Sequence, residues 1–162
     1  MALRRKQLSP RLKTILSYVV GDCLADIGTD HAYLPIEACL DNIVKKALAC
    51  DYYPGPLSKA EININRFGLN DRIETRLGFG LQPVNPGEAD SAVISGMGGM
   101  RILEILQASK EVASNLKRLI VQPQHDIPAV RQYLYDEDFD IIDEILVLEK
   151  HRKYTIIVAE PK

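Results

Sequence analysis

The chain has 162 residues, of which 46% are hydrophobic and 26% are charged, and its formal net charge is −2. This composition predicts a packed globular domain and lacks the strong basic excess of a dedicated nucleic-acid binder. No apolar run reaches the roughly 18 residues that span a membrane, and no secretory signal opens the chain, so we expect a cytoplasmic protein without a membrane partner.

The spacing of cysteine and histidine does not indicate a metal centre. The three cysteines, Cys23, Cys39 and Cys50, include no CxxC pair. The three histidines are far apart in the sequence and form no HExxH motif. We therefore expect neither a disulfide framework nor a bound metal. We favour a monomer.

Apolar runs alternate with amphipathic helical patterns along the chain. Ser9-Pro10 supplies an N-cap and a first-turn proline for a helix over 9–20, which precedes a core over 22–162 in a single domain of residues 1–162. The remaining patterns predict five strands, at 23–27, 46–50, 73–77, 91–94 and 119–121, and four further helices, at 31–40, 56–67, 101–108 and 127–135.

The last two predicted strands break this alternation. Residues 141–148 and 154–159 are separated by a short charged turn that leaves no room for a helix, so the two strands must be antiparallel. The predicted fold is α/β, with a mostly parallel Rossmann-like sheet and a C-terminal antiparallel hairpin. This strand inventory resembles that of class I methyltransferases, which depend on S-adenosylmethionine (SAM).

Unusual residues collect where the predicted strands end, which is where open α/β sheets bind their ligands. They are Asp26, Gly28 and Asp30 at the end of the first strand, Asp51 after the second, Gly78-Phe79-Gly80 after the third, Gly96-Met97-Gly98-Gly99 after the fourth, and Gln122-Pro123 after the fifth. Five such turns at one edge of a sheet indicate a binding crevice.

The first turn lies in LADIGTDHAYLP, residues 24–35, and indicates the kind of ligand. A dinucleotide fingerprint would have glycines at positions 30 and 33, but this chain has Asp30 and Tyr33. Gly28 still permits a tight turn, and Asp51 lies 23 residues later, where a carboxylate can accept both ribose hydroxyls. An anionic Asp30 would repel a pyrophosphate but is compatible with an ammonium or sulfonium group, which favours SAM as the cofactor.

The motifs DIGTDHAYLP, GMGG and QP at these spacings closely resemble the bacterial tRNA adenine-N1 methyltransferases that modify adenosine 22, the TrmK family. The resemblance covers essentially the whole chain, and it implies SAM-dependent methylation of adenine N1 in tRNA. It implies that Asp30 is the catalytic carboxylate and that Tyr33, Gln122 and Pro123 contact the substrate. It also implies a cofactor site formed by Asp26, Gly28, Thr29, His31, Asp51, Tyr52, Gly78, Phe79, Gly96, Met97 and Gly98.

Two departures from the family bear on tRNA binding. Members often have QPN where this chain has QPQ at 122–124, which puts a polar contact from Gln124 in doubt, and they continue into C-terminal helices that help to hold tRNA. We therefore expect weak tRNA binding, with Arg4, Arg5 and Lys6 as substrate contacts. A second basic cluster lies at residues 150–153, and the alternative to RNA binding is that these charges are simply exposed to solvent.

Several alternatives stay open on the sequence alone. Asp30 could serve only as the N-cap of a helix that begins at His31, His31 could be a supporting or capping residue rather than a general base, and Met97 could be a packing residue. Two other functions are a methyltransferase of the same fold that acts on a protein or small molecule, and a non-catalytic module of this fold that binds RNA.

Overall fold

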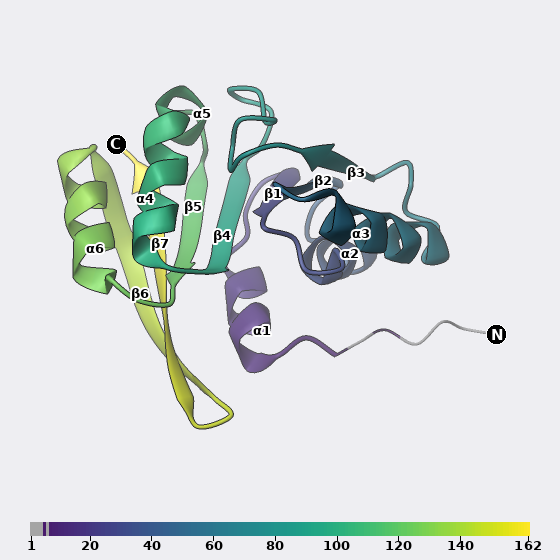
Figure 1. The fold of residues 1–162 in the computed structure, drawn as a ribbon, viewed down its shortest axis with the longest axis horizontal. Coiled ribbons are helices and arrows are strands. Elements are labelled where there is room, and N and C mark those ends of the chain that lie inside the picture. The colour runs from purple at the N-terminus through teal and green to yellow at the C-terminus, as the bar shows by residue number, and fades with distance from the viewer. Residues whose placement is uncertain (1–4, 6) are drawn as a thin grey trace.

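The structure is a computed structural model that describes Arg5 and residues 7–162; Arg4 and Lys6, two of the expected tRNA contacts, lie outside the described residues. Over the described part of the chain, a seven-stranded sheet lies between two layers of helices (Figure 1). Its strands are β1 Cys23–Ile27, β2 Lys46–Asp51, β3 Ile73–Leu77, β4 Ser91–Met97, β5 Arg118–Pro123, β6 Phe139–Glu149 and β7 Arg152–Pro161.

The strands follow the order β3-β2-β1-β4-β5-β7-β6. Strands β1 to β5 are parallel, and β7 runs antiparallel between β5 and β6. The predicted Rossmann-like fold with a C-terminal antiparallel hairpin is therefore confirmed. The direction of chain progression reverses between β1 and β4, and this switch point is where open α/β sheets form their binding crevice.

Each face of the sheet is covered by three helices. Alternate strand residues point to opposite faces, so that Leu24 and Val93 belong to one core, whereas Ala25 and Ile94 belong to the other. The helices on the first face are α1 Pro10–Ser17, α2 Tyr33–Leu40 and α3 Pro54–Arg66, and those on the second are α4 Gly99–Ala108, α5 Lys110–Ser114 and α6 Ile127–Asp136. In the described residues no helix has the length and apolar character needed to cross a bilayer.

The start of α2 differs from the prediction in a way that affects the site. The helix begins at Tyr33 rather than at His31, because His31 and Ala32 have left-handed φ angles of 52° and 57°. Ala32 is the N-cap, and no side chain caps the helix. The interpretation of Asp30 as an N-cap is therefore wrong. The capping prediction for α1 is confirmed, since Ser9 Oγ accepts a hydrogen bond from Leu12 N at 3.3 Å.

Several other elements differ from the prediction in their bounds or were not predicted. The α1 helix ends at Ser17 rather than at residue 20, and the short α5 was not predicted. Strand β4 continues past Ile94 to Met97, with an irregular pairing to β5 around Gly96, whose φ is 76°. This bulge brings the end of β4 to the crevice beside β1.

Candidate functional site

The turn after β1 folds back against the end of β2. The backbone N–H groups of Gly28 and Thr29 both donate to the Cys50 carbonyl, each at 3.0 Å. Gly28 has a φ of 77°, and a Cβ at this position would come within 3.1 Å of Met97 Cε. A residue with a side chain would be strained at this φ, so the backbone conformation favours glycine, and the flexible end of Met97 would also have to shift by a few tenths of an ångström.

Asp26 is the buried acid of this turn. Its exposed fraction is 5%, and burial is the largest cause that raises the pKa of its carboxyl to about 7. The Thr29 hydroxyl lowers this pKa, although it forms no well-aligned hydrogen bond in the described residues, and the negative charges of Asp30 and Asp51 raise it. Near neutral pH, a cationic group bound beside Asp26 would favour the ionised carboxylate.

Asp30 and His31 form a polar pair at the mouth of the turn. Asp30 Oδ1 lies 2.6 Å from His31 Nδ1, and the Asp30 side chain is 71% exposed. The His31 ring stacks on Tyr33 with a centroid separation of 5.1 Å and an interplanar angle of 11°. Asn63 Nδ2 donates to the His31 carbonyl at 2.9 Å, which supports the left-handed backbone at this point. Asp30 is thus oriented by a neighbouring side chain while its carboxylate faces solvent.

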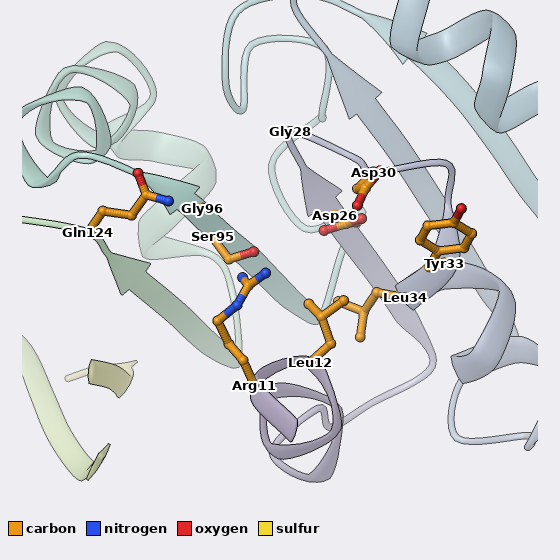
Figure 2. Close-up of a pocket in the computed structure, with 10 residues that line it drawn as sticks. All are labelled: Arg11, Leu12, Asp26, Gly28, Asp30, Tyr33, Leu34, Ser95, Gly96 and Gln124. Atoms are coloured by element: carbon orange, nitrogen blue, oxygen red, sulfur yellow. The ribbon is translucent and has the colours of Figure 1, made fainter. Parts of the chain in front are cut away.

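A cavity of about 280 Å³, here named the Asp26 cavity, opens between β1, β4 and α1. Figure 2 shows the Arg11 guanidinium reaching from α1 toward Ser95, with Asp26 and Asp30 on the opposite wall. Its lining residues are Arg11, Leu12, Asp26, Gly28, Asp30, Tyr33, Leu34, Ser95, Gly96 and Gln124. The cavity therefore has carboxyl groups on one wall and a guanidinium on the other.

Gln122 supports the part of the cavity wall that is formed by Arg11 and Gly96. It is fully buried, and its Oε1 accepts from Arg11 Nη1 at 3.1 Å and from Gly96 N at 3.0 Å. Its Nε2 donates to the Pro123 carbonyl at 3.3 Å. Gln122 and Pro123, which we expected to contact the substrate, are both buried and do not line the cavity, whereas Gln124 does. Gln122 instead positions Arg11 and the β4 bulge.

A second cavity of about 290 Å³, here named the Asp51 cavity, lies on the other side of Gly28. Phe79 forms edge-to-face contact with Tyr52 at 6.1 Å, and the Arg101 guanidinium lies 5.2 Å from the centre of the Phe79 ring. Asp51 Oδ1 accepts from Tyr53 N at 2.9 Å. The lining residues are Ile27, Gly28, Asp51, Tyr52, Tyr53, Pro56, Gly78, Phe79, Gly80, Met97, Arg101 and Ile105.

Most of the residues expected at the site line one of these two cavities. Thr29, His31 and Gly98 lie in the same turns but line neither. Arg5 lies apart from both cavities, and its guanidinium pairs with Glu37 at 3.2 Å and Asp41 at 2.8 Å.

Sequence reasoning missed Arg11, Ser95 and Arg101 as cavity residues. Arg101 follows the glycine-rich turn at the start of α4, so its position beside that turn was a usable signal. Arg11 had no such signal, because its partner Gln122 is 111 residues away in the sequence.

Comparison with known proteins identifies the family. The sequence model of the family described as "Methyltransferase domain" matches residues 8–157. The chain is 41% identical over 155 residues to the tRNA (adenine(22)-N(1))-methyltransferase of Bacillus subtilis, covering 95% of this chain and 65% of the relative. The crystal structure of the B. subtilis M1A22 tRNA methyltransferase TrmK superposes with a TM-score of 0.92 at 40% identity, over 96% of this chain and 67% of that one. The chain belongs to the TrmK family.

A second TrmK-type structure bears on the cofactor. It is that of Streptococcus pneumoniae Sp1610, a putative tRNA (m1A22) methyltransferase, in complex with S-adenosyl-L-methionine. The TM-score is 0.92 at 35% identity, over 96% of this chain and 73% of that one. The chain spans 65% of the length of the B. subtilis relative.

Proposed function

We propose that this chain transfers a methyl group from SAM to N1 of adenine 22 in tRNA. The observation that carries the proposal is the pair of cavities that meet at Gly28, one beside Asp51 and Phe79, the other beside Asp26 and Asp30. An elongated ligand could cross Gly28 and occupy both, and its reactive end would then lie beside Asp30. A tRNA substrate implies a cytoplasmic enzyme.

The residues present fit SAM. The Asp26 cavity sets two carboxyl groups against the Arg11 guanidinium, which complements the ammonium and carboxylate of an amino-acid zwitterion. The Asp51 carboxylate can accept the two ribose hydroxyls, and Phe79 and Tyr52 offer aromatic surface to an adenine ring. Three acids around the Gly28 turn are also unfavourable for a pyrophosphate, which argues against a dinucleotide.

The chemistry asks little of a general base before the transfer. When bound, SAM supplies an electrophilic methyl group on a sulfonium. Adenine N1 already carries a lone pair, so most of the acceleration should come from holding the base in line with that methyl group, an effect that can supply roughly 7–11 kcal/mol. The cavity walls formed by Leu12, Tyr33 and Leu34 are apolar or aromatic and can hold an extruded base.

Asp30 acts on the charge that develops on the adenine ring. Methylation at N1 makes the ring cationic until the exocyclic amine loses a proton. An exposed carboxylate at the cavity mouth can stabilise that charge and accept the proton, a contribution of about 10²–10⁴-fold. With its ring proton on Nδ1, His31 donates to Asp30 and fixes the direction of the carboxylate.

The test is a methyl-transfer assay with radiolabelled SAM and unmodified tRNA that has A or G at position 22. We expect label only on the tRNA with A. The Asp30→Asn variant should bind SAM within a few-fold of the parent affinity while methyl transfer falls at least tenfold. Asp71→Asn provides the matched control, because Asp71 is exposed, lines neither cavity and precedes the amino end of β3, opposite the carboxyl ends that carry the site.

Each other outcome would exclude part of the proposal. SAM binding without label on either tRNA would mean that the acceptor is a different substrate, such as a protein or small molecule. No SAM binding would mean a non-catalytic module. An unchanged rate in Asp30→Asn would remove Asp30 from the chemistry.

A further inference from the structure

The β6–β7 hairpin reaches past the edge of the sheet that carries the site. Ile157 of β7 pairs with Val121 of β5, and β5 ends two residues later at Pro123. Strand β7 begins at Arg152, so about three of its residues, roughly 10 Å at the usual rise per residue, lie beyond the end of β5. Figure 1 shows this yellow-green hairpin projecting on the same side as α1. Its tip, residues 150–153, therefore stands beside the mouth of the site.

The tip is strongly basic. It consists of Lys150, His151, Arg152 and Lys153, and all four residues are exposed. Within the part of the chain that the structure describes, none of the ion pairs involves any of these side chains. The neighbouring carboxylate, Glu149, is already engaged, since its Oε1 accepts from Arg11 N at 3.0 Å. Three full cations thus face solvent on a chain whose net charge is −2.

A groove connects this tip to the Asp26 cavity. The groove has a volume of about 490 Å³, and its far end is lined by Leu148, Glu149 and Lys150 of the hairpin. At its near end it shares four lining residues with the Asp26 cavity, namely Arg11, Leu12, Asp30 and Tyr33. A polymer that follows the groove would pass the basic tip while one of its units enters the cavity.

The backbone conformation of the hairpin turn does not favour the side chains that occupy it. Lys150 and His151 are the two central residues, with φ angles of 48° and 66°. Two-residue hairpin turns with positive φ at both positions strongly favour Asn-Gly, because side chains with a Cβ are strained there. Two long cationic or titratable side chains in this conformation lower the stability of the turn, so a role in binding gives them a physical reason.

We propose that the tip of the β6–β7 hairpin, residues 150–153, is an RNA-docking arm that binds backbone phosphates next to the target adenine. This inference rests on the proposed function, because it assigns the part of the surface that holds the tRNA. It differs from the expectation that the N-terminal cluster holds the tRNA, since Arg5 is paired with two carboxylates whereas the cations of the tip are unpaired. Lysine and arginine at phosphates supply affinity without base specificity, which suits an arm placed outside the cavity.

The experiment compares two variants that remove the same charge from opposite edges of the sheet. The arm variant is Lys150→Gln, Arg152→Gln, Lys153→Gln. The control variant is Lys45→Gln, Lys46→Gln, Lys117→Gln, whose positions are exposed and lie at the amino ends of β2 and β5, away from the site. The probe is the unmodified tRNA with A at position 22. Its Kd is measured by filter binding over a range of salt concentrations, together with KM and kcat for tRNA and the Kd for SAM.

We expect the arm variant to bind tRNA about tenfold more weakly at low salt. In a plot of the logarithm of the tRNA association constant against the logarithm of the salt concentration, the magnitude of the slope should fall by about 2–3, which corresponds to three lost phosphate contacts. Its KM for tRNA should rise by the same factor, while kcat and the Kd for SAM stay within twofold of the parent values. The control variant should stay within twofold in every measurement.

Two results would overturn the proposal that the hairpin tip docks RNA. One is an unchanged salt slope and tRNA affinity in the arm variant; the other is an equal loss in the control variant, which would mean that only net charge matters. The binding measurements keep this proposal separate from the proposed function. If the parent chain binds tRNA but transfers no methyl group, the proposed activity fails, and the two salt slopes still decide whether the arm holds RNA.

Discussion

Replacing Asp26 with asparagine should make the fold more stable and cofactor binding weaker. Burial and the neighbouring acids raise the pKa of this carboxyl from 3.8 to about 7, so the folded chain holds the proton more tightly than the unfolded chain does. The resulting stability is fully present below pH 3.8 and is lost as the pH rises through about 7.

The pKa difference sets the size of the effect. A shift from 3.8 to about 7, at 1.36 kcal/mol per pH unit, costs the folded state about 4 kcal/mol at pH 8 and about 2 kcal/mol at pH 5. Asparagine cannot ionise, so the gain in unfolding free energy from Asp26→Asn should be about 2–3 kcal/mol larger at pH 8 than at pH 5.

The assay is urea unfolding of the parent chain and Asp26→Asn at pH 5, 6.5 and 8, followed by SAM titration of both. The exposed Asp71→Asn variant is the matched control, and its difference from the parent should be small at each pH. We expect Asp26→Asn to bind SAM at least about tenfold more weakly, because a charge-assisted hydrogen bond is lost. A stability gain of the same size at pH 5 and pH 8 would refute the assignment of a raised pKa to Asp26.

Two further predictions follow from the described geometry. SAM binding should release up to about one proton near pH 7 and strengthen as the pH rises from 6 to 8, because a bound cation returns the pKa of Asp26 from about 7 toward its ordinary value. Calorimetry in buffers of different ionisation enthalpy measures the released proton. A binding enthalpy that is the same in all buffers would contradict this prediction. His151→Gly should raise the unfolding free energy by about 1 kcal/mol, because glycine adopts a φ of 66° without strain, whereas His151→Ala should give no such gain. Urea unfolding of both variants tests this prediction. Equal effects of the two substitutions would show that the turn is unstrained.

The elements that sequence reasoning located best are those with strong local signals. The first strand and its turn followed from an apolar run and Gly28, and the hairpin followed from two apolar runs too close for a helix. Asp51 was found because spacing from the glycine turn is a property of the sequence alone. Each of these features depends on neighbours within about 25 residues.

The elements that were missed depend on contacts made only in the folded chain. No glycine in the sequence indicates the left-handed backbone at His31, which is supported by a hydrogen bond from Asn63 on α3. The inward position of Gln122 and the outward position of Gln124 follow from the side-chain alternation at the end of β5 and from Arg11 on α1. A helix outside the sheet and a strand inside it cannot be paired by periodicity, because period alone does not say which elements touch.

The sheet separates the two cores, yet the two cavities at its carboxyl edge take lining residues from helices of both layers. The Asp26 cavity is bounded by α1 and α2 of one layer, whereas the Asp51 cavity reaches Ile105 on α4 of the other. A cofactor that crosses Gly28 would therefore contact residues of α1 and α2 at one end and of α3 and α4 at the other.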